Sequence, residues 1–288
     1  MRRKRYKIRK KGAYYHIVNH VSGAKEDLPF DDDDKSYAFF LIRKFLKLYC
    51  LDLISVCWMS NHFHIVLFAP GKPPSINCTA SRFNQHYELN PSSCRYLDPA
   101  KNKALCMITS EKLIDISCFM KSLQQSFSIY FNRKHNRQGP VWKERFWSTI
   151  LEGRKALWDC VKYVELNPVR AGIVEKPEDY AFSTWGRVFK NGKHPFESCF
   201  EKHMRKTYIR HNSKQRERVY ISDVYSLFSE ELNHILLYEK RLTVDAQRKV
   251  YIAAHKNSHS HFSRFLLRNK HWSKGLIIGS IKFVDDLL

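Results

Sequence analysis

Two apolar runs separated by a short turn constrain the fold of this chain more than any other feature. The runs are LDLISVCWM at residues 51–59 and NHFHIVLFAP at residues 61–70, and they meet at Ser60 and Asn61. Short apolar runs that are rich in β-branched and aromatic residues and bounded by turn residues are typical of β-strands. The sequence therefore predicts two consecutive strands joined by a tight turn.

The second of these strands carries two histidines one residue apart, His62 and His64. Successive side chains of a strand point to opposite faces, so both imidazoles share a face and Phe63 lies on the other. Two imidazoles on one face can share a metal ion. A second such pair, His259 and His261, lies in a polar stretch without strand periodicity, where solvated loop histidines explain it better. The strand context makes the first pair the candidate metal ligands.

The remaining patterns predict a split βαβ arrangement with an extra helix. The expected elements, in order, are a strand at 13–21, a helix at 36–50, the two strands above, a helix at 111–134, a strand at 145–151 and a helix at 154–167 closed by Pro168. Strand, helix, strand, strand, helix, strand is the order of the split βαβ motif. Residues 71–110 carry Pro, Asn and Ser without a clear period, so we expect an insertion or long loop there.

The charge of the chain favours a polyanionic partner. Its 50 Lys and Arg residues outnumber its 28 Asp and Glu residues, which gives a formal net charge of +22. Nucleic acid is the leading candidate partner, although net charge by itself also fits a merely basic soluble protein. The first twelve residues, MRRKRYKIRKKG, are mostly basic and contain no acid. They form either a solvated tail or an arm that lies along phosphates.

Cysteine usage and hydropathy indicate a cytoplasmic protein. The eight cysteines contain no CxxC pair, which argues against a zinc ribbon or a dense disulfide framework and favours reduced thiols. The basic N-terminus has no apolar signal core, and no segment approaches the roughly 18 uninterrupted apolar residues of a membrane span. We therefore expect no membrane association.

The helix predicted at 154–167 offers a nucleophile. Tyr163 and Asn167 are four residues apart and so share a helical face, at the edge of the apolar stripe of Leu157, Val161 and Val164. A helix that lies over the sheet could present both side chains to the histidine face. The alternative is that Tyr163 is an ordinary packing residue with its hydroxyl in water.

A second tyrosine and a basic stretch lie at the end of the preceding helix. Tyr130 is the rival nucleophile, but it shares the apolar face of Leu123 and Phe127, which favours core packing. Cations interleaved with aromatic rings are typical of surfaces that neutralise phosphates and stack bases. The candidate DNA contacts are Arg133, Lys134, Arg137, Trp142, Lys143 and Arg145, with Trp147 in the same stretch and Arg170 after the Asn-Pro pair. A solvated loop packed on a structural tryptophan is the alternative.

Five blocks in fixed order resemble a known family. They are YYHIVNHV, WMSNHFHIVLF, GPVWKERFWSTIL, YVELNPVRAGIV and PEDYAFSTW. In this order and spacing they are similar to the REP-associated tyrosine transposases, relatives of the single-tyrosine HUH transposases of small insertion sequences. The resemblance covers about residues 6–188 and matches the insertion at 71–110 less well. It implies an α+β fold, with a ferredoxin-like catalytic domain built on an antiparallel sheet.

The resemblance also implies roles for individual residues. His62 and His64 match the HUH pair, Tyr163 matches the nucleophile, and Asn167 takes the position that completes the metal site, where relatives often carry Gln. Imidazole and amide oxygen without thiolate suit Mg²⁺ or Mn²⁺ better than a structural zinc ion. The implied activity is cleavage and rejoining of single-stranded hairpin DNA of the REP type through a 5′-phosphotyrosine intermediate, by a monomer or a homodimer.

Two other functional classes stay open at this stage. A catalytically silent nucleic-acid-binding protein would need only the basic charge and the aromatic residues. A metal-dependent hydrolytic nuclease that uses a bound water would need the histidine pair but not Tyr163. Neither class explains why Tyr163 and Asn167 stand at i and i+4 in a helix that ends at an Asn-Pro pair. Covalent transesterification accounts for all of these features.

The composition changes beyond Trp185, which suggests two domains. We expect a catalytic domain at 1–190 and a basic linker with a helical accessory domain at 191–288. Residues 200–220 look like a linker or an exposed basic helix, a helix is expected to open at Ser222, and the last stretch reads as a helix, a Gly turn and a short helix. The accessory domain either adds DNA contacts or is purely structural.

Overall fold

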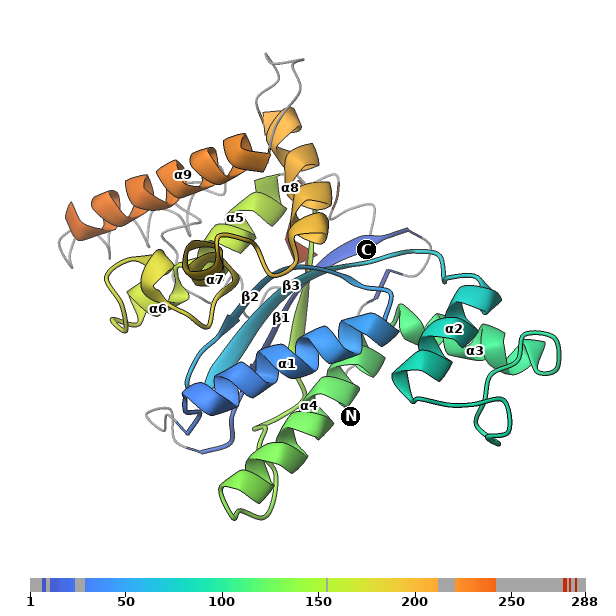
Figure 1. The fold of residues 1–288 in the computed structure, drawn as a ribbon. Helices are drawn as coiled ribbons and strands as arrows, with labels where there is room; N and C mark the ends of the chain where they lie inside the picture. Colours follow the sequence, from blue (N-terminus) through green and yellow to red (C-terminus); the bar gives the residue numbers. More distant parts are fainter. Residues whose placement is uncertain are drawn as a thin grey trace.

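The fold is known from a computed structural model, which describes residues 7–8, 11–23, 29–153, 155–211, 221–241, 277–278, 280 and 283. Its centre is one five-stranded sheet (Figure 1). The strands are β1 (Ala13–His20), β2 (Asp52–Trp58), β3 (His62–Ala69), β4 (Trp147–Leu151) and β5 (Ile277–Ile278), in the spatial order β2-β3-β1-β4-β5. The first four strands pair antiparallel with their neighbours. This is the ferredoxin-like order, so the predicted α+β fold class is confirmed.

Helices α1 (Asp32–Leu48) and α4 (Ile116–Lys134) cover one face of the sheet (Figure 1). They pack on the side chains of β3 that alternate with the histidines. Phe63, Ile65 and Leu67 belong to one apolar cluster with residues of both helices. This face is the main hydrophobic core of the protein.

The other face of the sheet carries the C-terminal half of the described chain. Its elements are α5 (Lys155–Glu165), α6 (Asn167–Arg170), the 3₁₀ turn η1 (Pro177–Asp179), α7 (Thr184–Asn191), α8 (Glu197–His211) and α9 (Ile221–Arg241). Val66 of β3 clusters here with Leu157 and Val161 of α5. The sheet is therefore buried on both faces, and each face has its own apolar cluster.

Residues 71–110, for which an insertion or a long loop was expected, contain regular helices. They contain α2 (Ile76–His86) and begin α3 (Lys103–Leu113), which pack together around Ala80, Leu97 and Cys106. Ser75 caps α2 by accepting a hydrogen bond from the Cys78 amide. The long-loop alternative was wrong because the apolar residues here do not follow one clear helical face: Leu105, Met107 and Ile108 of α3 are exposed.

Two predicted helix boundaries also change. The helix expected at 111–134 is divided, since α3 ends at Leu113 and Asp115 starts α4 by accepting hydrogen bonds from the Ser117 and Cys118 amides. The helix expected at 154–167 ends at Glu165. Pro168 lies at the first turn of α6, where its missing N–H costs nothing, so it starts a short helix and does not only end one.

The elements after α7 pack on the sheet and on α5. Helix α8 occupies much of the stretch predicted to be a linker or exposed helix, and its Lys202 and His203 contact Asp52 of β2 at 2.6 and 2.8 Å. Ile277–Ile278 form β5, which pairs parallel with β4 where a helix or turn was expected. The rest of the predicted terminal helices lies outside the described residues. No helix in the described part of the chain combines the length and apolar character needed to span a membrane.

Candidate active site

Four histidines share the face of the sheet that α5 covers. Strands β1 and β3 pair antiparallel with Val18 opposite His64 and His20 opposite His62. Side chains alternate along each strand, so His16 and His20 of β1 point to the same side as the predicted pair. The sequence analysis missed these two residues, although the same period-two argument applied to the strand YYHIVNHV would have found them.

The imidazoles of His62 and His64 both use Nδ1 in hydrogen bonds. His62 Nδ1 lies 2.6 Å from Asn61 Oδ1, and His64 Nδ1 lies 3.0 Å from Nε2 of the fully buried His16. An amide oxygen only accepts, so His62 carries its proton on Nδ1 and keeps the lone pair on Nε2. A histidine that ligates a metal commonly donates its other ring N–H in this way. The arrangement fits a pair of Nε2 ligands when His64 donates to His16.

The surroundings keep the histidine pair neutral. Burial, together with the neighbouring His20, lowers the pKa of His62 to about 3. Burial also lowers the pKa of His64 well below its ordinary value, with His62 and His16 adding to the effect. Neutral imidazole is the form that binds metal ions.

Helix α5 brings Tyr163 against this histidine face. The Tyr163 ring lies edge-on to the rings of His64 and His16, with centroids 5.6 and 5.9 Å apart and interplanar angles of 89° and 83°. Only 2% of the side chain is exposed, so Tyr163 is not a packing residue with its hydroxyl in water. The structure thus brings together the two parts of the site that are about a hundred residues apart in sequence.

Two residues of α6 surround the tyrosine. The guanidinium of Arg170 lies 5.7 Å from the centroid of the Tyr163 ring. Burial raises the pKa of the Tyr163 hydroxyl, and the charge of Arg170 opposes that rise. Asn167 is buried one helical turn beyond Tyr163, and its amide nitrogen donates to the Tyr163 carbonyl at 2.8 Å. This hydrogen bond uses the nitrogen of the amide, and the oxygen is the atom that binds cations.

The donor set is compatible with a divalent cation but contains no carboxylate. Among the described residues, no third imidazole, thiolate or carboxylate joins His62 and His64 in a compact group of ligand atoms. The amide oxygen of Asn167 is then the candidate third protein ligand. Two imidazoles and an amide leave room for phosphate and water oxygens, as Mg²⁺ and Mn²⁺ require.

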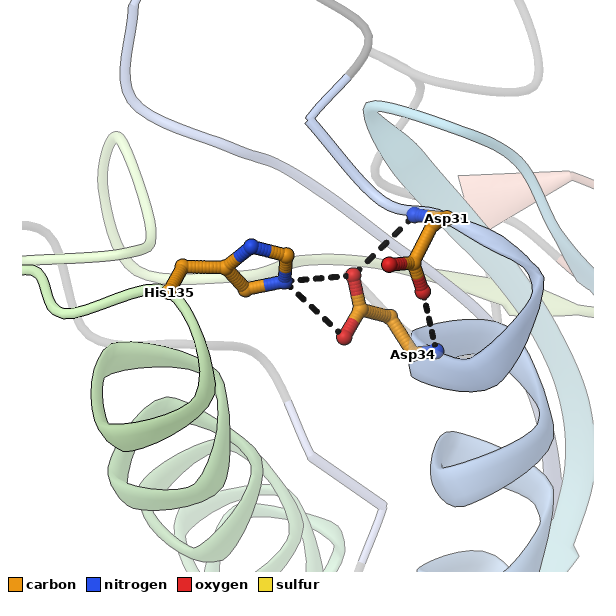
Figure 2. A group of neighbouring side chains, drawn as sticks. All are labelled: Asp31, Asp34 and His135. Atoms are coloured by element: carbon orange, nitrogen blue, oxygen red, sulfur yellow. Dashed lines mark hydrogen bonds and ion pairs between the residues drawn. The ribbon is translucent and has the colours of Figure 1, made fainter.

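A different cluster in the described chain has the composition of a metal site, but the ammonium group of Lys134 already pairs with its carboxylates. Asp31, Asp34 and His135 bring three ligand atoms within 4.8 Å of one another (Figure 2). The Lys134 ammonium lies 2.7 Å from Asp31 Oδ1 and 3.1 Å from Asp34 Oδ1. The two aspartates also cap α1, each accepting the other's backbone N–H. The cluster therefore anchors the end of α4 to the start of α1.

The candidate DNA contacts divide into three groups. Lys143 and Arg145 are exposed beside the end of β1, where the Lys143 amide donates to the His20 carbonyl at 3.0 Å. Arg133 and Arg137 are exposed at the end of α4, near the cluster that holds Lys134. Arg170 lies at the tyrosine, as described above. Of these groups, Lys143 contacts the end of β1 and Arg170 contacts Tyr163, whereas Arg133 and Arg137 lie at the end of α4, on the other side of the sheet.

The two tryptophans of the basic stretch differ. Trp142 packs in the main core against Phe63 and Phe127, at centroid distances of 5.3 and 5.5 Å, and its indole N–H donates to the Gln124 carbonyl at 3.2 Å. Trp147, at the start of β4, is 42% exposed. Trp142 therefore has the structural role that the sequence left as an alternative, and Trp147 offers the more accessible ring.

Comparison with known proteins gives a consistent resemblance. No family model matches the chain. A curated Haemophilus influenzae protein described as a REP-associated tyrosine transposase is 22% identical over 172 residues, which cover 57% of this chain and 80% of the relative. The chain resembles REP-associated tyrosine transposases. The namesake from Escherichia coli K12 is 33% identical over 57 residues, which cover 20% of this chain and 34% of that protein.

One solved structure of a REP-associated tyrosine transposase bound to a REP hairpin also matches. The match covers 68% of this chain and 89% of that one, with 16% identity and a TM-score of 0.42. The bound hairpin is a feature of that solved structure.

Proposed function

We propose that this chain is a REP-associated tyrosine transposase that cleaves and rejoins hairpin-bearing single-stranded DNA through a covalent bond to Tyr163. The observation that carries the proposal is the edge-on contact of the Tyr163 ring with His64 and His16, at 5.6 and 5.9 Å. This contact supports the role that the resemblance implies for Tyr163, because the ring lies against His64, one of the two proposed metal ligands of β3. The similar curated proteins, both described as transposases of this kind, support the same activity.

The reaction is a transesterification. The Tyr163 oxygen attacks the phosphorus of one phosphodiester, the bond from phosphorus to the 3′ oxygen breaks, and the tyrosine proton ends on the released 3′ hydroxyl. The products are a 5′-phosphotyrosine and a free 3′ end, and attack by a 3′ hydroxyl reverses the step. No water is consumed, so the energy of the phosphodiester is kept for rejoining.

Residues around Tyr163 would adjust the acidity of its hydroxyl and bind the phosphate that it attacks. Burial disfavours the phenolate of Tyr163, and the Arg170 guanidinium near its ring offsets part of that effect and can bind the incoming phosphate. His62, His64 and Asn167 would hold a Mg²⁺ or Mn²⁺ ion. Such an ion, when bound, polarises the scissile phosphate and stabilises charge that develops on it.

The DNA would approach along the end of the sheet where β1 ends and β3 begins. Lys143 and Arg145 lie beside His20 there, and Arg133 and Arg137 extend the positive charge toward the end of α4. Trp147 offers an exposed ring for base stacking. Lys134 would reach a phosphate only by giving up its ion pairs with the aspartates of the α1 cap.

The test is incubation of labelled single-stranded hairpin DNA with the full chain and Mn²⁺ or Mg²⁺, followed by a denaturing gel. Wild type should give a metal-dependent protein–DNA band, and Tyr163→Phe should lose it. Tyr130→Phe is the matched control, because Tyr130 stacks on Tyr37 at 3.7 Å on the opposite side of the sheet. It should behave as wild type.

The same experiment separates the competing functions. Cleavage that survives Tyr163→Phe would show hydrolysis by a bound water. Binding of several hairpins without cleavage by wild type would show a silent nucleic-acid-binding protein. A band lost in Tyr130→Phe and kept in Tyr163→Phe would move the nucleophile to α4 and overturn the proposal.

A further inference from the structure

Helix α9 lies along α5 on the side away from the sheet (Figure 1). Its buried side chains recur at helical spacing and belong to the same apolar cluster as α5 and α7. They are Val224, Phe228, Leu232, Ile235 and Leu236. The Phe228 ring meets the rings of Trp158 at 5.4 Å and Trp185 at 4.8 Å. The helix that carries the tyrosine is thus enclosed between the sheet and α9.

One polar group of α9 crosses this apolar contact. Glu231 Oε2 accepts the indole N–H of Trp158 at 2.9 Å and lies 2.5 Å from the Lys162 ammonium. Lys162 also contacts Asp159 at 3.0 Å, and only 8% of its side chain is exposed. A cation this well buried needs its anions, because an unpaired buried charge is costly. Glu231 therefore fastens α9 to two positions on the outward side of α5.

These positions fix how α5 is rotated about its axis. Lys162 directly precedes Tyr163, and Trp158 lies one turn earlier. Consecutive helical residues point about 100° apart, so Lys162 faces α9 while Tyr163 faces the sheet. A rotation that carried the tyrosine away from His64 would pull Lys162 from its carboxylate.

We propose that Glu231 is a positioning residue for Tyr163, acting through Trp158 and Lys162. This inference rests on the proposed function, since it concerns the orientation of the same nucleophile. The proposal gives α9 a role in orienting Tyr163, in place of the two roles expected from the sequence, which were to add DNA contacts or to be purely structural. A misplacement of a reacting group by about 1 Å can cost roughly a hundredfold in rate.

The test compares single-turnover adduct formation on hairpin DNA, well below the unfolding temperature, in the full chain. Glu231→Ala loses both contacts and should react about ten- to a hundredfold more slowly. Glu231→Gln keeps an acceptor for Trp158 and should be intermediate. Hairpin affinity and Mn²⁺ affinity should equal those of wild type in both variants. These binding readouts separate a misplaced tyrosine from a damaged metal or DNA site.

Asp52→Asn is the matched control. It removes the carboxylate that binds Lys202 and His203 of α8, an ion-pair site of the same C-terminal region that does not touch Tyr163. It should lower thermal stability and leave the adduct rate unchanged. A loss of rate in Asp52→Asn as large as that in Glu231→Ala would show that stability alone matters and would overturn the inference.

A double-mutant cycle tests the pathway. Lys162→Met should slow the reaction, and Lys162→Met combined with Glu231→Ala should be slower by clearly less than the product of the two single effects. Independent effects would contradict a shared contact. An active wild type with an equally fast Glu231→Ala overturns only this inference, whereas a wild type that forms no adduct overturns the proposed function as well.

Discussion

The two faces of β3 differ in what they bury. Toward α1 and α4 the strand presents Phe63, which stacks on Trp58 with centroids 4.7 Å apart in an apolar cluster. Toward α5 it presents His62, which stacks on His20, and His64, which contacts His16 and Tyr163. Phe63 and His64 are neighbours in sequence, but one packs in the main core and the other contacts Tyr163. The period of two lets one strand pack against the main core on one side and present the candidate metal ligands on the other.

Both faces bury polar groups, but with different partners. On the α1 and α4 side, the fully buried Asp34 of the α1 cap pairs with the Lys134 ammonium. On the α5 side, the partners are hydroxyls and a backbone amide. Glu165 is buried, hydrogen-bonds with the hydroxyls of Ser55 and Thr184, and accepts the Trp185 amide. Such burial is tolerated only because each group has partners.

The largest effect is expected from a substitution that changes only the α5 face of β3. His64→Ala should reduce adduct formation on hairpin DNA by more than about a thousandfold, because it removes a proposed metal ligand and the edge contact of the tyrosine. Its unfolding temperature should change by only a few degrees. Gel quantification and thermal denaturation check the two parts. An adduct yield within tenfold of wild type would remove His64 from the site.

The neighbouring residue should show the reverse behaviour. Phe63→Ala leaves a cavity in a fully buried aromatic cluster and should lower the free energy of unfolding by about 3–4 kcal/mol. Urea denaturation measures this loss. At low temperature the folded fraction should still form the adduct at close to the wild-type rate. A catalytic defect without a loss of stability would mean that the two faces are not separate in function.

Local patterns were sufficient to predict this division. The alternation in NHFHIVLFAP placed His62 and His64 on one face and Phe63 on the other, and the order of segments predicted the split βαβ fold. Both were read from patterns along the sequence, the alternation of one strand and the order of the segments. The meeting of Tyr163 with His64 was expected from helix spacing and the resemblance, and the structure shows the two rings in contact.

What escaped prediction depends on partners distant in sequence. The hydrogen bond from His64 to His16 requires the register of β1 against β3. Strand β5 is only two residues long and is defined by its hydrogen bonds to β4. Such a short pairing leaves no periodic pattern in the sequence from which a strand could be predicted. The ion pair of Lys162 with Glu231 connects residues that are 69 positions apart in sequence. It could not be predicted, because a Lys side chain is by default expected in water.

A smaller effect distinguishes the two lysines of the basic stretch. Lys143→Met should weaken hairpin binding by about 1 kcal/mol and reduce the slope of log affinity against log salt by about 0.7–0.9, as expected for one lost phosphate contact. Lys134→Met should leave the slope unchanged. It should instead lower the free energy of unfolding by about 1–3 kcal/mol, because the fully buried Asp34 loses its cation. Titrations of both variants at several salt concentrations, with urea denaturation, give the comparison.

Equal salt slopes for wild type and Lys143→Met would exclude that lysine from the DNA path. A reduced slope in Lys134→Met would mean that DNA draws this lysine out of the α1 cap, which would join the two faces in one binding surface.

The smallest effect concerns how α8 is attached to the sheet. Burial alone would raise the pKa of Asp52, but hydrogen bonds from His203 and Lys202 outweigh it and lower that pKa to about 2, below the ordinary 3.8. A carboxylate with a depressed pKa stabilises the fold above its unfolded pKa and loses this contribution as the pH falls through the folded value. Asp52→Asn should therefore cost about 1 kcal/mol at pH 6 and progressively less between pH 4 and 2. Thermal denaturation of both proteins across this range measures the difference. A difference that stays constant down to pH 2 would show that the asparagine disturbs packing and that the ion pair contributes nothing, which would also disqualify Asp52→Asn as a pure charge control for the α9 contact.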